Sequence, residues 1–204
     1  MLEVESLHLW RGERHVLRGV GFVLSAGQCL QVTGPNGAGK TSLLRTLAGL
    51  IYPESGQVRW GGRDVRADLR AFHAGLAYLG HEPPLKADLT ARENLRFWIG
   101  NRQRVSAKQL AAALTRVGAE GFADRLVRTL SAGQRRRVAL AALTLLPVAL
   151  WLLDEPATNL DAEGQRLVAA LLSEQLARGG LAVAALHHEL PGTLGVVQAL
   201  ELAA

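Results

Sequence analysis

Short apolar runs separated by glycine-containing turns dominate the first third of this chain. Apolar and polar residues alternate loosely at positions 2–9, and positions 16–24 and 29–33 are mainly apolar. Such short runs bounded by turn residues predict β-strands. Apolar residues at positions 43–50 have helical spacing, and the segment at 57–62 ends in two glycines like one strand of a hairpin. The first third therefore combines strands with one helix.

In the rest of the chain, helical patterns alternate with continuous apolar runs. Predicted helices cover 108–117 and 165–177 and also follow Arg137, and predicted strands cover 149–153 and 181–186. Ser106 and Gln109 have the spacing of a capping box, which places the start of the first of these helices. Strands without polar positions, alternating with helices, indicate a mainly parallel sheet that is covered on both faces. The pattern therefore predicts an α/β fold.

The stretch at 89–129 is helical and more polar than its neighbours. No internal repeat or low-complexity linker separates it from the remaining sequence. We therefore expect one domain over residues 1–204, with a helical subdomain inserted at about 84–130. A chain of 204 residues with 49% hydrophobic content is long enough to bury the core of such a domain.

Cysteine content and hydropathy indicate an intracellular protein. Cys29 is the only cysteine, so no intramolecular disulfide can form and a reducing compartment is expected. The sequence starts without a basic segment leading into an apolar one, as a secretory signal would require. The most apolar run, at 138–153, is shorter than the roughly 18 residues of a membrane span and contains Pro147. We expect it to form a buried helix followed by a buried strand.

The net charge of +5 permits an anionic partner but does not identify one. The chain has three lysines, and arginines supply the remaining positive charge, which is distributed along the sequence. A tail or block of positive charge, typical of nucleic-acid binding, is missing from this pattern. We therefore interpret most of these arginines as parts of solvated faces and expect no nucleic-acid partner.

A phosphate-binding motif lies between a predicted strand and a predicted helix. It comprises Gly34, Pro35, Asn36, Gly37, Ala38, Gly39, Lys40 and Thr41, followed by Ser42. In G-x-x-x-x-G-K-[ST], the glycines allow backbone N–H groups to face a phosphate chain, and the helix that follows adds its positive dipole end. Lys40 is expected to contact the β- and γ-phosphates, and the Thr41 hydroxyl to bind Mg²⁺. This predicts a nucleoside triphosphate as ligand.

Two carboxylates follow the predicted strand at 149–153. Asp154 and Glu155 would lie at the carboxyl end of a buried strand, where open α/β sheets bind their ligands. One carboxylate can hold Mg²⁺ and the next can polarise an attacking water. With the phosphate loop, this pair predicts phosphoryl transfer or hydrolysis, a class that still includes small-molecule kinases.

The segment Ser131, Ala132, Gly133 and Gln134, preceded by a leucine, narrows the choice. It resembles the LSGGQ signature of ATP-binding cassette (ABC) ATPases, with alanine in place of the first glycine. That resemblance implies a P-loop NTPase fold with an antiparallel β portion and an inserted helical subdomain. It also implies a dimer of two copies, in which this signature faces the ATP bound by the other copy. An exposed helix start suits an anionic ligand.

Other family motifs occur in the family's order. Asp161 lies in a segment that resembles the D-loop, and His187 occupies the place of the switch histidine that contacts the γ-phosphate, with neighbouring His188 as the competing candidate. Trp10 lies near the position of the aromatic residue that stacks on adenine. A tryptophan at a strand end can equally serve packing, so both interpretations of Trp10 stay open.

Residues 78–86 (YLGHEPPLK) resemble the Q-loop, which joins the catalytic core of ABC ATPases to their helical subdomain. His81 stands where the family usually has glutamine. Imidazole is a poor Mg²⁺ ligand compared with a carbonyl oxygen. We therefore expect His81 to act through water, through the γ-phosphate or as a mechanical link.

Within the ABC family, the Q-loop histidine and the short chain most resemble the ATP-binding subunits of the cytochrome c maturation (Ccm) system. The resemblance implies ATP and Mg²⁺ as cofactors, separately encoded membrane subunits and, indirectly, a haem chaperone as partners. It also implies a peripheral location on the cytoplasmic face of the inner membrane. His8, His15 and His73 are isolated in the sequence and do not indicate haem ligation. An ABC subunit for another substrate, or a soluble non-transport ABC ATPase, are the alternatives.

Overall fold

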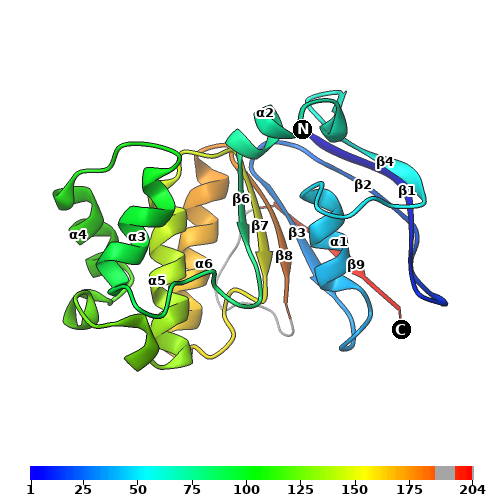
Figure 1. The fold of residues 1–204 in the computed structure, drawn as a ribbon. Helices are drawn as coiled ribbons and strands as arrows, with labels where there is room; N and C mark the ends of the chain where they lie inside the picture. The colour runs from blue at the N-terminus through cyan, green and yellow to red at the C-terminus, as the bar shows by residue number, and fades with distance from the viewer. Residues whose placement is uncertain (187–195, 204) are drawn as a thin grey trace.

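The computed structural model describes residues 1–186 and 196–203 and contains two β-sheets (Figure 1). One sheet is antiparallel, with the order β2-β1-β4-β5. Its strands are β1 (Leu2–Arg11), β2 (Arg14–Leu24), β4 (Ser55–Trp60) and β5 (Arg63–Asp64). The β4–β5 hairpin turns at Gly61 and Gly62, both of which have positive φ. The hairpin strand predicted at 57–62 is therefore confirmed.

The second sheet has the order β6-β7-β8-β3-β9, and all of its strands are parallel. Its strands are β3 (Gln28–Thr33), β6 (Leu76–Leu79), β7 (Leu150–Asp154), β8 (Leu181–Ala185) and β9 (Val196–Glu201). Every residue of β7 and β8 is buried, as expected for central strands that are covered on both faces. The mainly parallel sheet with an antiparallel β portion is confirmed.

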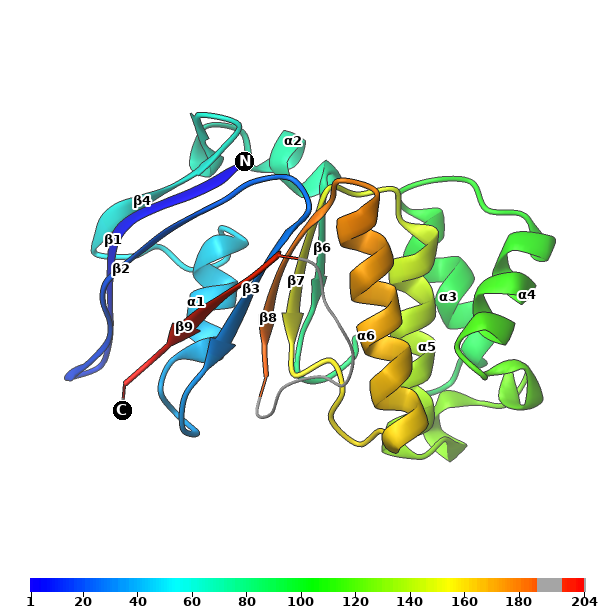
Figure 2. The same ribbon diagram turned by 180° about the vertical axis from the view of Figure 1, so that it is seen from behind.

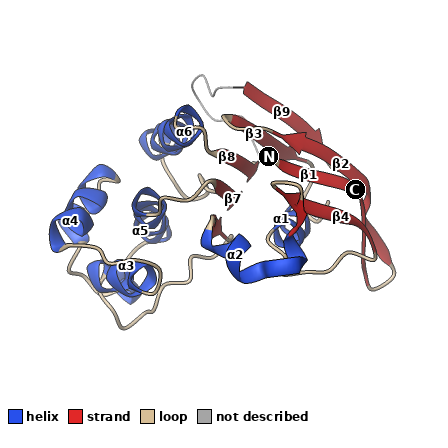
Figure 3. Cartoon of the chain, turned by 90° about the horizontal axis from the view of Figure 1, so that it is seen from above, coloured by secondary structure: helices blue, strands red, loops and turns tan. Residues whose placement is uncertain are grey.

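Helices cover both faces of the parallel sheet (Figure 3). Helix α1 (Lys40–Leu47) lies between the two sheets, where its leucines share one apolar core with both of them. Helices α5 (Ala132–Leu145) and α6 (Ala162–Ala177) cover the opposite face and share a second core with Trp151 and Leu153 of β7. The short helix α2 (Leu69–Ala74) precedes β6. This layering makes the loops after the parallel strands accessible at one end.

Helices α3 (Ala91–Gly100) and α4 (Ala107–Arg116) pack with α5 on the side away from the antiparallel sheet. Both begin with a capping box, formed by Thr90 with Glu93 and by Ser106 with Gln109. The second of these was predicted from the sequence. Short 3-10 turns η1 (Val65–Asp68), η2 (Glu120–Phe122) and η3 (Val127–Thr129) complete the helical content of residues 1–186 and 196–203. The limits of a helical subdomain at 84–130 stay a prediction.

The carboxyl ends of β3, β6 and β7 point to the same end of the molecule, where the tip of the β1–β2 hairpin also lies (Figures 1 and 2). The phosphate loop, the Q-loop and Glu155 follow these three strands. Open parallel sheets bind ligands at this end. No helix among the described residues is long and apolar enough to cross a membrane.

The helix predicted at 43–50 begins earlier and ends earlier than expected, at Lys40 and Leu47. Gly39 adopts φ 107°, which ends the phosphate loop and allows the helix to start at once. Its C-terminal limit follows from Gly49 at φ 69°, a conformation that breaks the helix. The strand predicted at 16–24 starts instead at Arg14, because Arg14 pairs with Arg11 across the hairpin.

Candidate functional site

The phosphate loop is shaped by glycines that lie against neighbouring backbone. A Cβ on Gly34, which has φ 135°, would lie 2.4 Å from the carbonyl oxygen of Leu202, and one on Gly39 would lie 2.4 Å from Cγ1 of Val16. No side chain fits at either position. These close contacts hold the loop between β3 and α1, so that it leads directly into the N-terminus of α1, where free backbone N–H groups favour an anion.

Lys40 is held inside this curve. Its side chain is 6% exposed, and Nζ donates hydrogen bonds to the carbonyl oxygens of Gly34 at 2.7 Å and Pro35 at 3.1 Å. A buried ammonium group needs such acceptors. The positive charge of Lys40 therefore lies within the loop. A bound phosphate would replace the neutral carbonyl oxygens as the hydrogen-bond acceptors of Nζ.

The phosphate loop is linked to β7 by a hydrogen bond from the Thr41 hydroxyl to Oδ2 of Asp154 at 2.7 Å. Asp154 is 1% exposed at the end of β7. A hydroxyl and a buried carboxylate are hard oxygen donors, the ligands that Mg²⁺ prefers. Mg²⁺ usually needs only one or two protein oxygens besides phosphate and water, so this pair fits a magnesium ion.

Glu155 follows Asp154 in an unusual backbone conformation with φ 51°. Its backbone N–H donates to the carbonyl oxygen of Ala185 at 3.0 Å, and this bond secures the turn. The carboxylate accepts a hydrogen bond from the Thr158 hydroxyl at 3.2 Å and lies 3.3 Å from Nδ1 of His81. The glutamate side chain is thus directed towards the Q-loop, and 15% of it is exposed.

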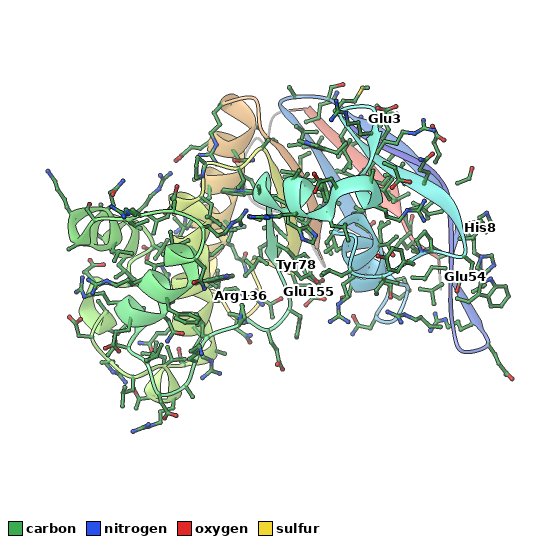
Figure 4. The ribbon with its side chains drawn as sticks, turned by 45° about the horizontal axis from the view of Figure 1, so that its top comes forward. Glu3, His8, Glu54, Tyr78, Arg136 and Glu155 are labelled. Atoms are coloured by element: carbon green, nitrogen blue, oxygen red, sulfur yellow. The ribbon has the colours of Figure 1, made fainter. Side chains whose placement is uncertain are left out.

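Arg136, on the signature helix α5, connects that helix to the Q-loop. Its guanidinium donates to the carbonyl oxygens of Gly80, at 3.0 Å, and His81. Burial lowers the pKa of Arg136, while the negative charges of Asp154 and Glu155 raise it. Figure 4 shows Arg136, Tyr78 and Glu155 near the centre of the molecule, with His8 and Glu54 at its outer edge. No motif in the sequence marks Arg136.

The signature segment forms the start of α5. Ser131 is the N-cap, and its side chain accepts a hydrogen bond from the Gln134 backbone N–H while the Gln134 side chain accepts one from the Ser131 N–H. Ser131 and Ala132 are exposed. A Cβ on Gly133 would lie 2.6 Å from the carbonyl oxygen of Asn159, so the segment that resembles the D-loop passes directly against the signature.

Asp161 ends that segment and caps α6. Its Oδ1 accepts hydrogen bonds from the Gly164 backbone N–H at 2.8 Å and from Arg137 at 3.2 Å. The Gly164 bond, followed by the charge of Arg137, lowers the pKa of Asp161. Although Asp161 is mostly exposed, these bonds fix its orientation beside the signature helix.

An open cleft of about 610 Å³ extends from the phosphate loop to Glu155. It is lined by Arg11, Arg14, Val16, Asn36, Gly37, Gly39, Lys40, Thr41, Ser42, His81 and Glu155. The cleft brings together the phosphate loop, the Q-loop histidine and the glutamate, which are far apart in the sequence. The signature residues do not line it.

Other predicted residues lie elsewhere. The Trp10 ring stacks on His15 with a centroid distance of 4.4 Å, and it is not among the residues that line the cleft. His8 hydrogen-bonds His15 at 3.1 Å, and His73 contacts the carbonyl oxygen of Ala48 at 2.7 Å. His187 and His188 lie outside the described residues.

Sequence reasoning missed Arg11, Arg14 and Val16 as cleft residues. All three belong to or border the turn between β1 and β2, and the alternation of residues along these strands was the signal that would have placed them on one face. The turn itself is not marked by any phosphate-binding motif. The binding and catalytic roles of the residues in the cleft stay predictions.

Comparison with known proteins places this geometry in a family. Residues 17–158 match the ABC transporter family. The chain is 49% identical over 187 residues to the cytochrome c biogenesis ATP-binding export protein CcmA of Methylococcus capsulatus, covering 91% of this chain and 90% of the relative. It is 45% identical over 202 residues to CcmA of Salmonella typhi, covering 99% and 97%.

Solved structures show the same fold. An ATP-binding subunit of an ABC transporter aligns with a TM-score of 0.80 and 26% identity, covering 91% of this chain and 79% of that one. A putative ABC transporter ATP-binding protein from Pyrococcus furiosus aligns with a TM-score of 0.84 and 24% identity, covering 98% and 96%. The chain therefore belongs to the ABC transporter family, whose ATP-binding subunits are ATPases, and within that family it belongs with the CcmA proteins.

Proposed function

We propose that this chain is the ATP-hydrolysing subunit of a membrane complex that acts in cytochrome c maturation. The relatives named above are cytochrome c biogenesis ATP-binding export proteins and match nearly the whole chain. The energy of hydrolysis would drive haem export or the release of a haem-loaded chaperone. The chain would act at the cytoplasmic face of the inner membrane, bound to separately encoded membrane subunits.

The observation that carries the proposed chemistry is the 2.7 Å hydrogen bond between Thr41 and Asp154. It joins the phosphate loop to the carboxyl end of β7, so that one divalent ion can contact the side chains of both Thr41 and Asp154. Mg²⁺ bound there would neutralise charge on the β- and γ-phosphates. Lys40 and the amides of residues 37–42 would hold the phosphate chain in the same cleft.

Glu155 is the residue that would polarise the attacking water. Its carboxylate lines the cleft and is oriented by the Thr158 hydroxyl. His81 lies 3.3 Å from the same carboxylate and is 59% exposed, so its ring faces both Glu155 and solvent. On this arrangement His81 acts as a hydrogen-bonding partner of Glu155 and the water, and not as a metal ligand.

A second copy of the chain would complete each site. Ser131, Ala132, Gly133 and Gln134 do not line the cleft, and the first two are exposed at the N-terminus of α5. Helix N-termini attract anions through their free N–H groups and dipole. In a head-to-tail dimer, this surface would face the γ-phosphate held by the partner, where His187 would also act.

Glu155→Gln tests the chemistry. The amide keeps the size of the side chain but cannot accept a proton, so ATP binding should persist while hydrolysis falls by about 10²- to 10⁴-fold. An ATP-bound dimer should accumulate on gel filtration. Glu120→Gln, at an exposed position in η2, is the control. Steady-state hydrolysis at the wild-type rate in Glu155→Gln would exclude Glu155 from this role.

The pathway is tested in a bacterium that lacks its own cytochrome c biogenesis ATP-binding protein. The wild-type chain should restore haem-stained c-type cytochromes, and Glu155→Gln should not. An active ATPase that restores no cytochromes and co-purifies with membrane subunits of another transporter would favour a different substrate. An active ATPase that co-purifies with no membrane protein would favour a soluble ABC ATPase.

A further inference from the structure

The β1–β2 hairpin presents two different faces near the nucleotide cleft. Arg11 pairs with Arg14, and Trp10 pairs with His15, as neighbouring rungs of the same hairpin. Arg11, Arg14 and Val16 line the cleft, whereas Trp10 and His15 do not. Since adjacent residues of a strand point to opposite faces, the arginines and the tryptophan are directed to opposite sides of the hairpin.

On the face away from the cleft, the aromatic residues are engaged with each other. The rings of Trp10 and His15 are parallel to within 2°, with their centroids 4.4 Å apart. His8 extends the stack, with a ring distance of 5.2 Å from His15 and a hydrogen bond to it. The Trp10 backbone N–H donates to Glu54 from the loop before β4. These contacts fix the orientation of the tryptophan ring, which stays 46% exposed.

On the cleft face, Arg14 lies directly beside the phosphate loop. A Cβ on Gly37 would lie 3.4 Å from Nη1 of Arg14, which places the guanidinium in van der Waals range of the loop. Within residues 1–186 and 196–203, arginines form ion pairs at positions 59, 66, 92, 116, 128 and 137. Arg14 is not in any of these pairs. Its charge is therefore available to an anion in the cleft.

We infer that Arg14 contacts the phosphate chain of the bound nucleotide from the hairpin side, opposite Lys40. The inference rests on the proposed function, because it requires ATP in this cleft. A planar guanidinium can donate two parallel hydrogen bonds to phosphate oxygens, which an ammonium group cannot. The hairpin thus contributes a cation to nucleotide binding, and the adenine contact expected from Trp10 stays a separate prediction.

The test compares Arg14→Gln with Arg18→Gln. Both changes remove one arginine charge from strand β2, but Arg18 does not line the cleft and bonds to the His15 carbonyl oxygen. A bound fluorescent ATP analogue is displaced either by ATP, which has the base, or by inorganic tripolyphosphate, which has only the phosphate chain. Comparing the two affinities separates the phosphate contact from contacts to the base. Arg14→Gln should weaken both ligands by the same factor, about tenfold. Arg14→Lys should recover part of this loss.

Several results would overturn the inference. Wild-type affinity of Arg14→Gln for both ligands would exclude a contact between Arg14 and the phosphate chain. A loss of affinity for ATP but not for tripolyphosphate would show that Arg14 contacts the nucleoside instead. An equal loss of affinity in Arg18→Gln would show that the effect comes from the net charge of the hairpin and not from a contact made by Arg14. Thermal unfolding of each variant separates these outcomes from misfolding. A wild-type chain that bound no ATP would instead overturn the proposed function.

Discussion

The two motifs expected to meet the same ATP, the phosphate loop and the signature, are built in opposite ways. In the first, Lys40 is almost fully buried, as is Asp154 of β7, which bonds to Thr41 of the loop, and each already has hydrogen-bond partners. In the second, Ser131 and Ala132 are exposed, and the hydrogen bonds of Ser131 only define the start of a helix. One motif has its charged group enclosed within the chain. The other leaves the start of a helix exposed, as the proposed contact with a nucleotide held by a second copy would require.

This contrast shows how a single chain can hold two half-sites. The buried half would bind nucleotide without a second copy, because the residues that line the cleft all belong to one chain. In the proposed dimer, the exposed half would act only when a second copy brings its nucleotide to this surface. Arg136 joins the halves, because it extends from the signature helix to the carbonyl oxygens of Gly80 and His81. Movement of α5 would therefore be transmitted to the residue that contacts Glu155.

Lys40→Ala should have the largest effect. It removes the cation of the buried half and takes the Nζ donor from the carbonyl oxygens of Gly34 and Pro35, the second of which keeps a bond from the Ala38 N–H. We expect kcat/KM for ATP to fall by at least about 10²-fold, as for other groups that stabilise a transferring phosphoryl group. Equilibrium ATP binding by the isolated chain should fall too. Turnover at the wild-type rate would show that this half is not the nucleotide site.

Gly133→Ala should affect the exposed half alone. The added Cβ would lie 2.6 Å from the carbonyl oxygen of Asn159, so the signature or the neighbouring segment must shift. A displacement of this kind can reduce a rate by about 10²-fold. ATP binding by the isolated chain should stay unchanged, while hydrolysis at saturating ATP falls.

Gly121→Ala is the matched control for this change, because no atom lies within 4 Å of a Cβ at Gly121. It should leave hydrolysis unchanged. If Gly133→Ala weakened ATP binding by the isolated chain as strongly as it slowed hydrolysis, the two halves would not be separate in the way described.

The buried half was predictable from sequence because its function requires specific residues at fixed spacing. Glycines are needed where a Cβ would meet Leu202 or Val16, and the Asp154-Glu155 pair follows an apolar run that only a central strand explains. The alternation of strands and helices likewise predicted the parallel sheet. These signals are local, so each can be recognised in a short stretch of the chain.

The contacts that connect distant segments were not predictable in this way. Arg136 is one of three consecutive arginines, and only the packing of α5 against the Q-loop distinguishes it as the buried one. Trp10 was the nucleotide contact expected on the β1–β2 hairpin, whereas no motif marked Arg14. The faces of both residues depend on the register of this hairpin, which contains irregularities between Leu9 and Trp10. A shift of one residue exchanges the two faces of a strand.

The smallest expected effect comes from the helix caps, and it separates stability from function. Ser131 and Ser106 form the same capping box at the starts of α5 and α4. Ser131→Ala and Ser106→Ala should each reduce the free energy of unfolding by about 1 kcal/mol, measured by urea denaturation. Only Ser131→Ala should also slow hydrolysis, because only that hydroxyl lies on the surface that would face the partner's nucleotide in the proposed dimer. Equal ATPase rates in the two variants, at equal loss of stability, would mean that the signature serine only caps a helix.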